Sequence, residues 1–142
     1  MMVSLVPKQL VHHCWPHIEE YLVKASEYTY GRYHSEDIYD LVSQRDDYQL
    51  WVAFDGDKHY GAVVSNFITY PNKRVLALQF CGGKQLKLWK KDMLELLKRW
   101  ARETGCEAIE STGRKGWMKI FEDDGYKFQW LTYELPIGAQ NG

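Results

Sequence analysis

The clearest pattern of hydrophobic and polar positions in this chain runs from Lys84 to Cys106. Apolar residues recur there at steps of three and four, which places them on one stripe of a helix of about five turns. The stripe consists of Leu86, Trp89, Met93, Leu96, Leu97 and Trp100. The opposite face is charged, and Gly105 is a natural stop because glycine adopts the left-handed conformation at a helix end without steric cost. The pattern predicts an amphipathic helix with one side against the core.

The segments on either side of this helix have the pattern of strands. A run from Val75 to Phe80 precedes it, with Gly82-Gly83 in between, and a run from Glu107 to Glu110 follows it. A helix of this length allows the right-handed crossover that joins two parallel strands. The two runs are therefore predicted to lie parallel and adjacent in one sheet.

Before this unit, three hydrophobic runs predict an antiparallel meander. They cover residues 48–54, 59–70 and 74–80. The connecting sequences, Asp55-Gly56-Asp57 and Pro71-Asn72-Lys73, are rich in residues that favour tight turns. Strands joined by such short turns pair with their neighbours in antiparallel order.

The region before the meander is predicted to be mainly helical. A short strand is expected at Val3–Val6, and Pro7 opens a helix at a position where its missing N–H costs nothing. Pro16 is expected to break or kink this helix, because its ring clashes with the preceding turn. Helical periodicity resumes at Ile18–Ala25, and another short helix is expected from Ser35.

After the second parallel strand, the chain is expected to add two elements. Arg114–Asp123 has the pattern of a short helix, Gly125 turns the chain, and Tyr126–Leu135 has the pattern of a final strand. Residues 138–142 are expected to form a loose tail. Because the length suits one domain and no internal repeat is visible, residues 1–142 are predicted to be a single domain.

Composition and charge limit the class of protein. Hydrophobic residues make up 45% and charged residues 26%, which is typical of a soluble globular domain. No apolar run approaches the roughly 20 residues of a membrane span, and the N-terminus lacks the layout of a signal peptide. A net charge of −1 favours neither specific nucleic-acid binding nor an anionic membrane. Cys14, Cys81 and Cys106 are odd in number and lack CxxC spacing, which indicates a reducing compartment, the cytoplasm.

Positive charge is concentrated on the long helix. The stretch from Lys84 to Arg102 holds seven of the 18 basic residues against two acids. A solvated helix surface explains this bias, and so does attraction of an anionic ligand or partner. His13 and His17 are spaced to share a metal ion, but Pro16 lies between them and no further ligand pattern completes the set, so no metal site is predicted.

The predicted order of elements resembles the GNAT fold of the Gcn5-related N-acetyltransferases. The resemblance covers nearly the whole chain and is most specific in WARETGCEAIE at 100–110 and GRKGWMKIFEDDGYKF at 113–128. It implies an α/β (α+β) domain with a mixed, mainly antiparallel sheet flanked by helices. The chain looks closer still to a group of phage-encoded GNAT-like proteins. The landmarks shared with that group are Trp15-Pro16, Leu50-Trp51-Val52, Cys81-x-Gly83, Trp100-Ala101 and Gly113-Arg114-x-Gly116-Trp117.

The resemblance also implies an activity, acetyl transfer from acetyl-CoA to an amine of unknown identity. In GNAT enzymes the cofactor lies in a slot between the strands that match Val75–Phe80 and Glu107–Glu110. Its pyrophosphate is bound by backbone N–H groups at the start of the long helix, where the helix dipole favours an anion. The amine attacks the thioester directly, a base or water chain takes its proton, and a tyrosine often protonates the leaving thiolate.

Candidate cofactor-binding residues follow from matching the chain to this pattern. Counting back from Trp100-Ala101 puts Gln85 at the first position of the pyrophosphate loop and Leu88 and Lys90 at its glycine positions. The glycine pair lies slightly earlier and offers a shifted loop, although a plain tight turn between strand and helix also explains it. The candidates are Gly82, Gly83, Lys84 and Gln85, with Lys87 and Arg114 adding positive charge.

Candidate catalytic residues follow in the same way. Glu27, Glu36 and Glu110 are acidic candidates for the general base, and Glu110 is selected because its strand would place it near the slot. Phe121 falls where enzymes of the family often carry the acid tyrosine, and a phenyl ring transfers no proton. Tyr126 is the candidate substitute; Tyr133 is an alternative, and a core role would suit either tyrosine.

A second function from a different class is consistent with the same residues. The altered glycine loop, Phe121 and the 15% of aromatic residues suit a GNAT-fold phage protein that has lost catalysis. Such a protein would act as a virion structural or host-interaction component. Protein partners or self-association would then replace acetyl-CoA, and the protein would be found in the host cytoplasm or the virion.

Overall fold

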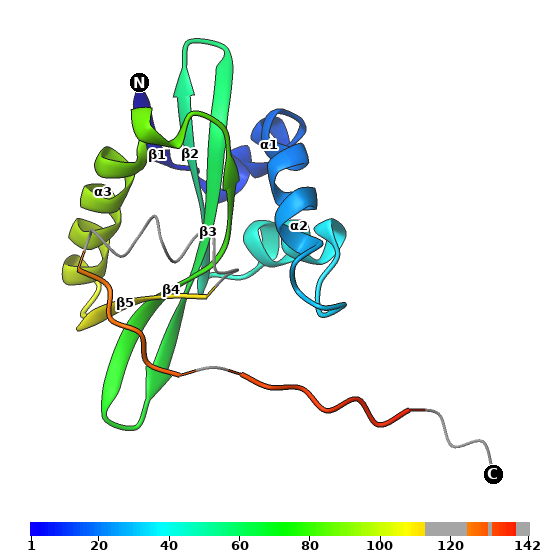
Figure 1. Cartoon of the computed structure of the whole chain (residues 1–142). Coiled ribbons are helices and arrows are strands. Elements are labelled where there is room, and N and C mark those ends of the chain that lie inside the picture. Colours follow the sequence, from blue (N-terminus) through cyan, green and yellow to red (C-terminus); the bar gives the residue numbers. More distant parts are fainter. Residues whose placement is uncertain (113–124, 131, 139–142) are drawn as a thin grey trace.

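The computed structural model describes residues 1–112, 125–130 and 132–138. Five strands within these residues form one sheet, and helices lie on both of its faces (Figure 1). In chain order the elements are β1 (Met2–Leu5), the 3-10 turn η1 (Lys8–Leu10), α1 (Val11–Ser26), α2 (Ser35–Gln44), β2 (Tyr48–Asp55), β3 (Lys58–Tyr70), β4 (Lys73–Gly83), the 3-10 turn η2 (Leu86–Leu88), α3 (Lys90–Glu103) and β5 (Ala108–Ser111). The predicted α+β fold class is confirmed.

The strands follow one another across the sheet in the order β1-β2-β3-β4-β5. All neighbours are antiparallel except β4 and β5, which run parallel with Val75 opposite Ala108 and Leu78 opposite Ser111. α3 forms the crossover between them, as a parallel pair requires. The predicted meander and the predicted parallel pair are both confirmed.

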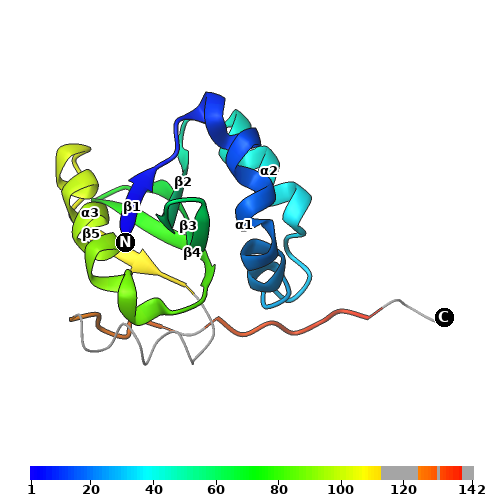
Figure 2. The ribbon, with the colours of Figure 1, turned by 90° about the horizontal axis from the view of Figure 1, so that it is seen from above.

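Helices α1 and α2 cover one face of the sheet and α3 covers the other (Figure 2). Under α1 and α2, Leu50 and Val64 of the sheet pack with Ile18 and Ile38 of the helices, and all four side chains are buried. Because both faces are covered, the central strands are hydrophobic at nearly every position instead of alternating. Within the described ranges no helix is both long and apolar enough to cross a membrane.

Pro16 does not end α1. The helix is continuous from Val11 to Ser26, and Trp15 and Ile18, on either side of the proline, are buried in the same core. Of the two predicted effects, a break or a kink, the break is therefore wrong, and the kink stays a prediction. Proline removes one helical hydrogen bond, and packing of the apolar face of the helix outweighs that loss.

The long helix begins later than its hydrophobic pattern predicts. α3 starts at Lys90, and the residues just before it form the 3-10 turn at Leu86–Leu88. Gln85 has a left-handed backbone with φ 52° and ψ 44°, which an α-helix does not accommodate. The apolar stripe packs as predicted, because Met93 and Leu97 are each 2% exposed.

The predicted final strand at 126–135 is not formed. Residues 126–130 and 132–135 have no regular secondary structure and pair with no strand of the described chain, and Phe128 and Trp130 are each 65% exposed. A strand needs a neighbouring strand for its backbone hydrogen bonds and a core for its apolar side chains. Within the described residues, this segment pairs with no strand, and most of its side chains are exposed. The helix predicted at 114–123 lies outside the described residues.

Candidate functional site

β4 and β5 pair over only part of the length of β4. The ladder runs from Val75 to Leu78 on β4, and the Thr112 N–H extends it by one bond of 3.3 Å to the Leu78 carbonyl. β4 then continues to Gly83 with β3 as its neighbour. Within the described residues, the pairing of β4 with β5 therefore ends at Leu78, and the predicted cofactor slot would open beyond this point.

A β-bulge lies directly after this ladder. Val64 is opposite Phe80 and Ser65 is opposite Leu78, so Gln79 is the extra residue of β4. A bulge leaves backbone groups outside the ladder and bends the strand, and bulges are over-represented next to active sites. Gln79 therefore has backbone groups outside the β3–β4 ladder, directly beyond the last residue of β4 that pairs with β5 in the described chain.

One row of residues crosses the sheet next to the last described pair of β4 and β5. The register places Tyr48, Asn66, Ala77 and Glu110 next to one another on β2, β3, β4 and β5. Directly paired residues point to the same face of a sheet. Tyr48 belongs to the core under α1 and α2, so the whole row lies on that face.

Glu110, the predicted base, is half-buried at the outer end of this row. Its Oε2 accepts a hydrogen bond from the Tyr70 hydroxyl at 3.1 Å. Burial, together with this hydrogen bond to the carboxylate, raises the pKa of the Tyr70 hydroxyl. The hydrogen bond therefore restrains the orientation of the Glu110 carboxylate near the end of the described β4–β5 pairing.

Sequence reasoning missed both Asn66 and Tyr70. The available signal for Asn66 was a polar amide within the apolar strand sequence AVVSNFITY, since a buried polar residue is more informative than an exposed apolar one. No local signal joins Tyr70 to Glu110, because they are 40 positions apart in the sequence.

The two candidate acid tyrosines both lie in the C-terminal segment without regular secondary structure. Tyr126 is half-buried and its hydroxyl oxygen is enclosed, whereas Tyr133 is 86% exposed. Catalytic acids work best in partly enclosed sites, so Tyr126 remains the better candidate. Arg114 and Phe121 lie outside the described residues.

Both glycines of the predicted cofactor loop are required by packing. A Cβ atom on Gly82 would clash with the backbone of α1, and one on Gly83 would clash with the Tyr60 carbonyl. Gly83 also lies under the indole ring of Trp89, as does Gly61 on the neighbouring strand. A closely packed turn therefore explains the glycine pair, and contacts to an anion are expected from the residues that follow it.

Those following residues are held in place by hydrogen bonds. The Lys84 N–H donates to the Tyr60 carbonyl at 2.8 Å, and the Trp89 indole N–H donates to the Lys84 carbonyl at 3.0 Å. The left-handed Gln85 then leads the chain into the 3-10 turn. Lys84, Gln85 and Lys87 are consequently exposed where β4 leads into α3.

Positive charge gathers at this point. Lys84, Lys87 and Lys91 are all exposed, with Asp92 as the acid in the first turn of α3. The first N–H groups of a helix have no helical partners, and the helix dipole is positive at that end. The start of α3 is therefore suited to attract a phosphate group.

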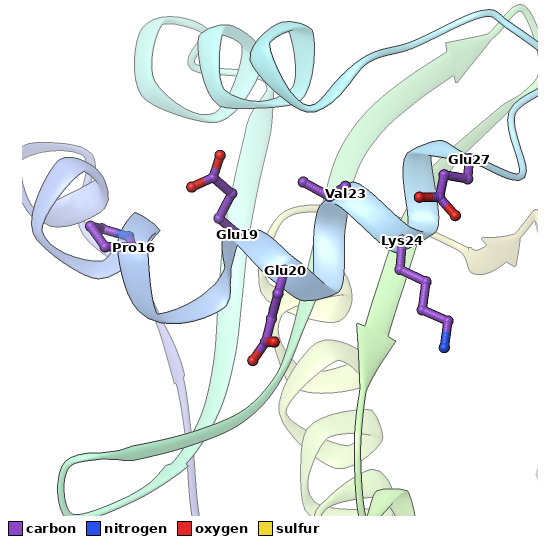
Figure 3. A pocket seen from close by; sticks show the side chains of 6 residues that line it. All are labelled: Pro16, Glu19, Glu20, Val23, Lys24 and Glu27. Carbon is purple, nitrogen blue, oxygen red and sulfur yellow. The ribbon is translucent and has the colours of Figure 1, made fainter.

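Two other features do not form a site. An open hollow on α1 is lined by Pro16, Glu19, Glu20, Val23, Lys24 and Glu27 (Figure 3). Its charged side chains point in different directions and do not converge on one position. Among the described residues, no group of three or more histidine, cysteine, aspartate or glutamate side chains is placed to hold a metal ion.

Comparison with known proteins identifies the fold. No family model matches the sequence, and no curated protein matches it either. Solved structures do match: a probable acetyltransferase has a TM-score of 0.71 at 18% identity, and the match covers 99% of this chain and 100% of that one. The chain has a GNAT-like fold.

Two further matches have more specific names. A ribosomal-protein-alanine N-acetyltransferase from Brucella melitensis biovar Abortus 2308 has a TM-score of 0.70 at 14% identity, with 96% of this chain and 100% of that chain covered. An aminoglycoside acetyltransferase from an uncultured soil metagenomic sample, in complex with sisomicin, has a TM-score of 0.70 at 13% identity, with 96% of each chain covered. At these identities the similarity concerns the fold.

Proposed function

We propose that this chain is an acyl-CoA-dependent N-acetyltransferase that transfers an acetyl group from acetyl-CoA to an amine. The observation that supports the proposal is the bulge at Gln79, directly after the last residue of β4 that pairs with β5 in the described chain. The lysine-rich start of α3 follows the end of β4, and Glu110 lies on β5, next to the predicted cofactor slot. A thioester inserted there would have its phosphates near the lysines and its carbonyl near the bulge.

The proposed cofactor-binding residues lie mainly between β4 and α3. Gly82 and Gly83 shape the turn, and Lys84, Gln85 and Lys87 bind the pyrophosphate through backbone and side-chain groups. Arg114 adds a further positive charge, a role proposed from the sequence resemblance alone.

The reaction needs one base and one acid. The amine nitrogen attacks the thioester carbonyl, the new C–N bond forms and the C–S bond breaks. Glu110 accepts the proton that the amine loses, directly or through a water molecule, and the Tyr126 hydroxyl donates a proton to the leaving thiolate. Both residues are half-buried, which suits proton transfer in a partly desolvated site.

The proposal also covers the domain organisation, the cellular location and the classes of partner. The protein works as a single domain over residues 1–142, in the cytoplasm of a phage-infected cell, with neither a membrane nor nucleic acid as partner. Support for this setting comes from the sequence: its resemblance to phage-encoded GNAT-like proteins, the unpaired cysteines and the near-zero net charge.

Calorimetric titration of the full chain with acetyl-CoA tests the cofactor. We expect binding tighter than about 100 μM, so that 1 mM acetyl-CoA raises the free energy of unfolding by more than about 1 kcal/mol. The double variant Lys84→Glu/Lys87→Glu should weaken binding about tenfold or more, since each lysine loses a charge-assisted contact. Arg99→Glu, at an exposed position on the same helix, is the matched control and should bind as the wild type does. No heat and no stabilisation with the wild-type chain would overturn the proposal.

A second candidate function is a GNAT-fold phage protein without catalysis, acting as a virion structural or host-interaction component. Exposed apolar side chains favour it, because large exposed apolar groups on a soluble protein often mark contacts with other proteins. These are Phe128, Trp130, Tyr133, Leu135 and Ile137, each at least 65% exposed. Self-association that Trp130→Ser abolishes, in a chain that does not bind acetyl-CoA, would support this candidate over the enzyme.

A further inference from the structure

Asn66 is a buried side chain whose amide lacks most of its hydrogen bonds. It is 6% exposed, and its Oδ1 accepts no hydrogen bond from any residue in the described part of the chain. Its Nδ2 makes one long hydrogen bond of 3.5 Å to the Phe67 carbonyl. Buried polar atoms are almost always paired, so an unpaired one marks a place where a partner belongs.

The neighbour of Asn66 on β4 is the smallest residue of its row. Ala77 lies between Asn66 on β3 and Glu110 on β5. Because neighbouring strands are about 4.8 Å apart, the backbones of Asn66 and Glu110 are about 10 Å apart across Ala77. Ala77 contributes only a methyl group, so a short position, named the gap, separates two longer side chains of the row that each end in an oxygen acceptor.

The charge of this gap is negative. The Glu110 carboxylate accepts a hydrogen bond from the neutral Tyr70 hydroxyl and forms no ion pair within the residues that the structure describes. Beyond Asn66, the row ends in the buried hydroxyl side chain of Tyr48. Carboxylate and amide oxygens only accept hydrogen bonds, so a ligand that satisfies both must carry two donors.

We infer that Asn66, Ala77 and Glu110 form the acceptor-binding gap, and that its ligand is a small molecule with two amine groups. One amine lies at Glu110 and reacts, and the other donates to the Asn66 Oδ1. The two nitrogens would be roughly 4–7 Å apart, given the strand spacing and hydrogen bonds of ordinary length. Asn66 thus selects the acceptor. The reaction of the bound amine rests on the proposed acetyltransferase function, whereas its binding does not.

Calorimetric titration without acetyl-CoA tests the gap, with 1,4-diaminobutane as the probe and n-butylamine, of equal length but with one donor, as its control. Wild-type protein should bind the diamine at least tenfold more tightly than the monoamine. Asn66→Leu should reduce this ratio to about twofold, and Glu110→Gln should weaken binding of both amines. Thr69→Ala, at an exposed position on the same strand, should leave the ratio unchanged. An unchanged ratio in Asn66→Leu, or no binding of diamine to the wild type, would overturn the inference.

A second variant covers the case in which Asn66→Leu does not fold, which a circular dichroism spectrum would show. Ala77→Val fills the gap and keeps both acceptors, and it should weaken diamine binding at least fivefold; unchanged binding would again overturn the inference.

The gap and the acetyltransferase function can be overturned separately. Diamine binding that depends on Asn66 without any acetyl-CoA binding would overturn only the acetyltransferase, whereas acetyl-CoA binding without a diamine preference would overturn only the gap.

Discussion

The indole N–H of Trp89 donates a hydrogen bond to the Lys84 carbonyl at 3.0 Å, and the Trp89 ring covers Gly61 and Gly83. The Trp89 side chain thereby connects the start of α3 with the first part of β3 and the end of β4. The turn that presents the exposed lysines is fixed by this contact, and the two glycines are the residues that allow it. The proposed pyrophosphate site thus depends on a buried tryptophan that need not touch the cofactor.

Gly61→Ala should therefore destabilise the protein by about 2 kcal/mol, because the added methyl group overlaps the Trp89 ring. Urea unfolding measures the cost. In a Trp89→Leu background the same substitution should cost at least about 1 kcal/mol less, since the clashing ring is gone. Equal costs in the two backgrounds would show that the ring does not require the glycine.

A pair of stacked histidines should make stability depend on pH. The rings of His17 on α1 and His59 on β3 are stacked, with centroids 4.7 Å apart. Burial, followed by the charge of His17, lowers the pKa of His59, and nearby Asp57 opposes this effect. The folded state therefore binds a proton less readily than the unfolded state. The stability contribution is complete above the ordinary histidine pKa of about 6.5 and is lost as the pH falls below it, toward the lowered pKa of the folded state.

Urea unfolding at pH 7.5 and pH 5.5 checks this dependence. His59→Phe keeps an aromatic ring at the stack and removes the titrating group, so it should lose less stability between these two pH values than the wild type. His12→Gln, at an exposed position on α1, the helix that carries His17, should behave as the wild type does. If His59→Phe and the wild type lose the same stability, other groups are responsible.

Asn66→Leu should raise the free energy of unfolding by about 1 kcal/mol in the absence of any ligand. Leucine has a similar size and removes the buried, unpaired amide oxygen, whose desolvation costs about 1–3 kcal/mol. Binding residues commonly reduce stability in this way. Thermal unfolding of the two proteins gives the comparison. A loss of stability would indicate that a bound water molecule, instead of an acceptor, satisfies Asn66 in the wild type.

The elements that sequence patterns predicted correctly are those whose signals are local. An antiparallel meander follows from three apolar runs joined by short turns, at 48–54, 59–70 and 74–80. The long helix follows from the helical spacing of the apolar residues before Gly105. Glu110 could be proposed as a site residue because its strand follows the crossover helix. Each of these inferences uses residues that are close together in the sequence.

The errors and omissions depend on contacts between distant residues. Pro16 is tolerated because Trp15 and Ile18 pack on a sheet formed much later in the chain. The bulge at Gln79 is a property of the register between β3 and β4. The sequence of β3 marks Asn66 only as a polar amide in an apolar strand, whereas its burial and its neighbours across the sheet depend on contacts with other strands.

Cys81 should be the least reactive of the three thiols. It lies on β4 opposite Val63 and packs against the core under α3. Part of the residue reaches the surface, but burial of the thiol raises its pKa to about 12. The thiolate is the reactive form, and at pH 8 only about one Cys81 thiol in 10,000 would be ionised.

Iodoacetamide at pH 8, followed by peptide mass mapping, should therefore modify Cys106 well before Cys81. In 8 M urea the two should react at similar rates, which separates protection by the fold from any effect of the local sequence. Equal rates in the native protein would mean that the Cys81 end of β4 is open to solvent, and the packing of Trp89 over Gly83 would then also be in question.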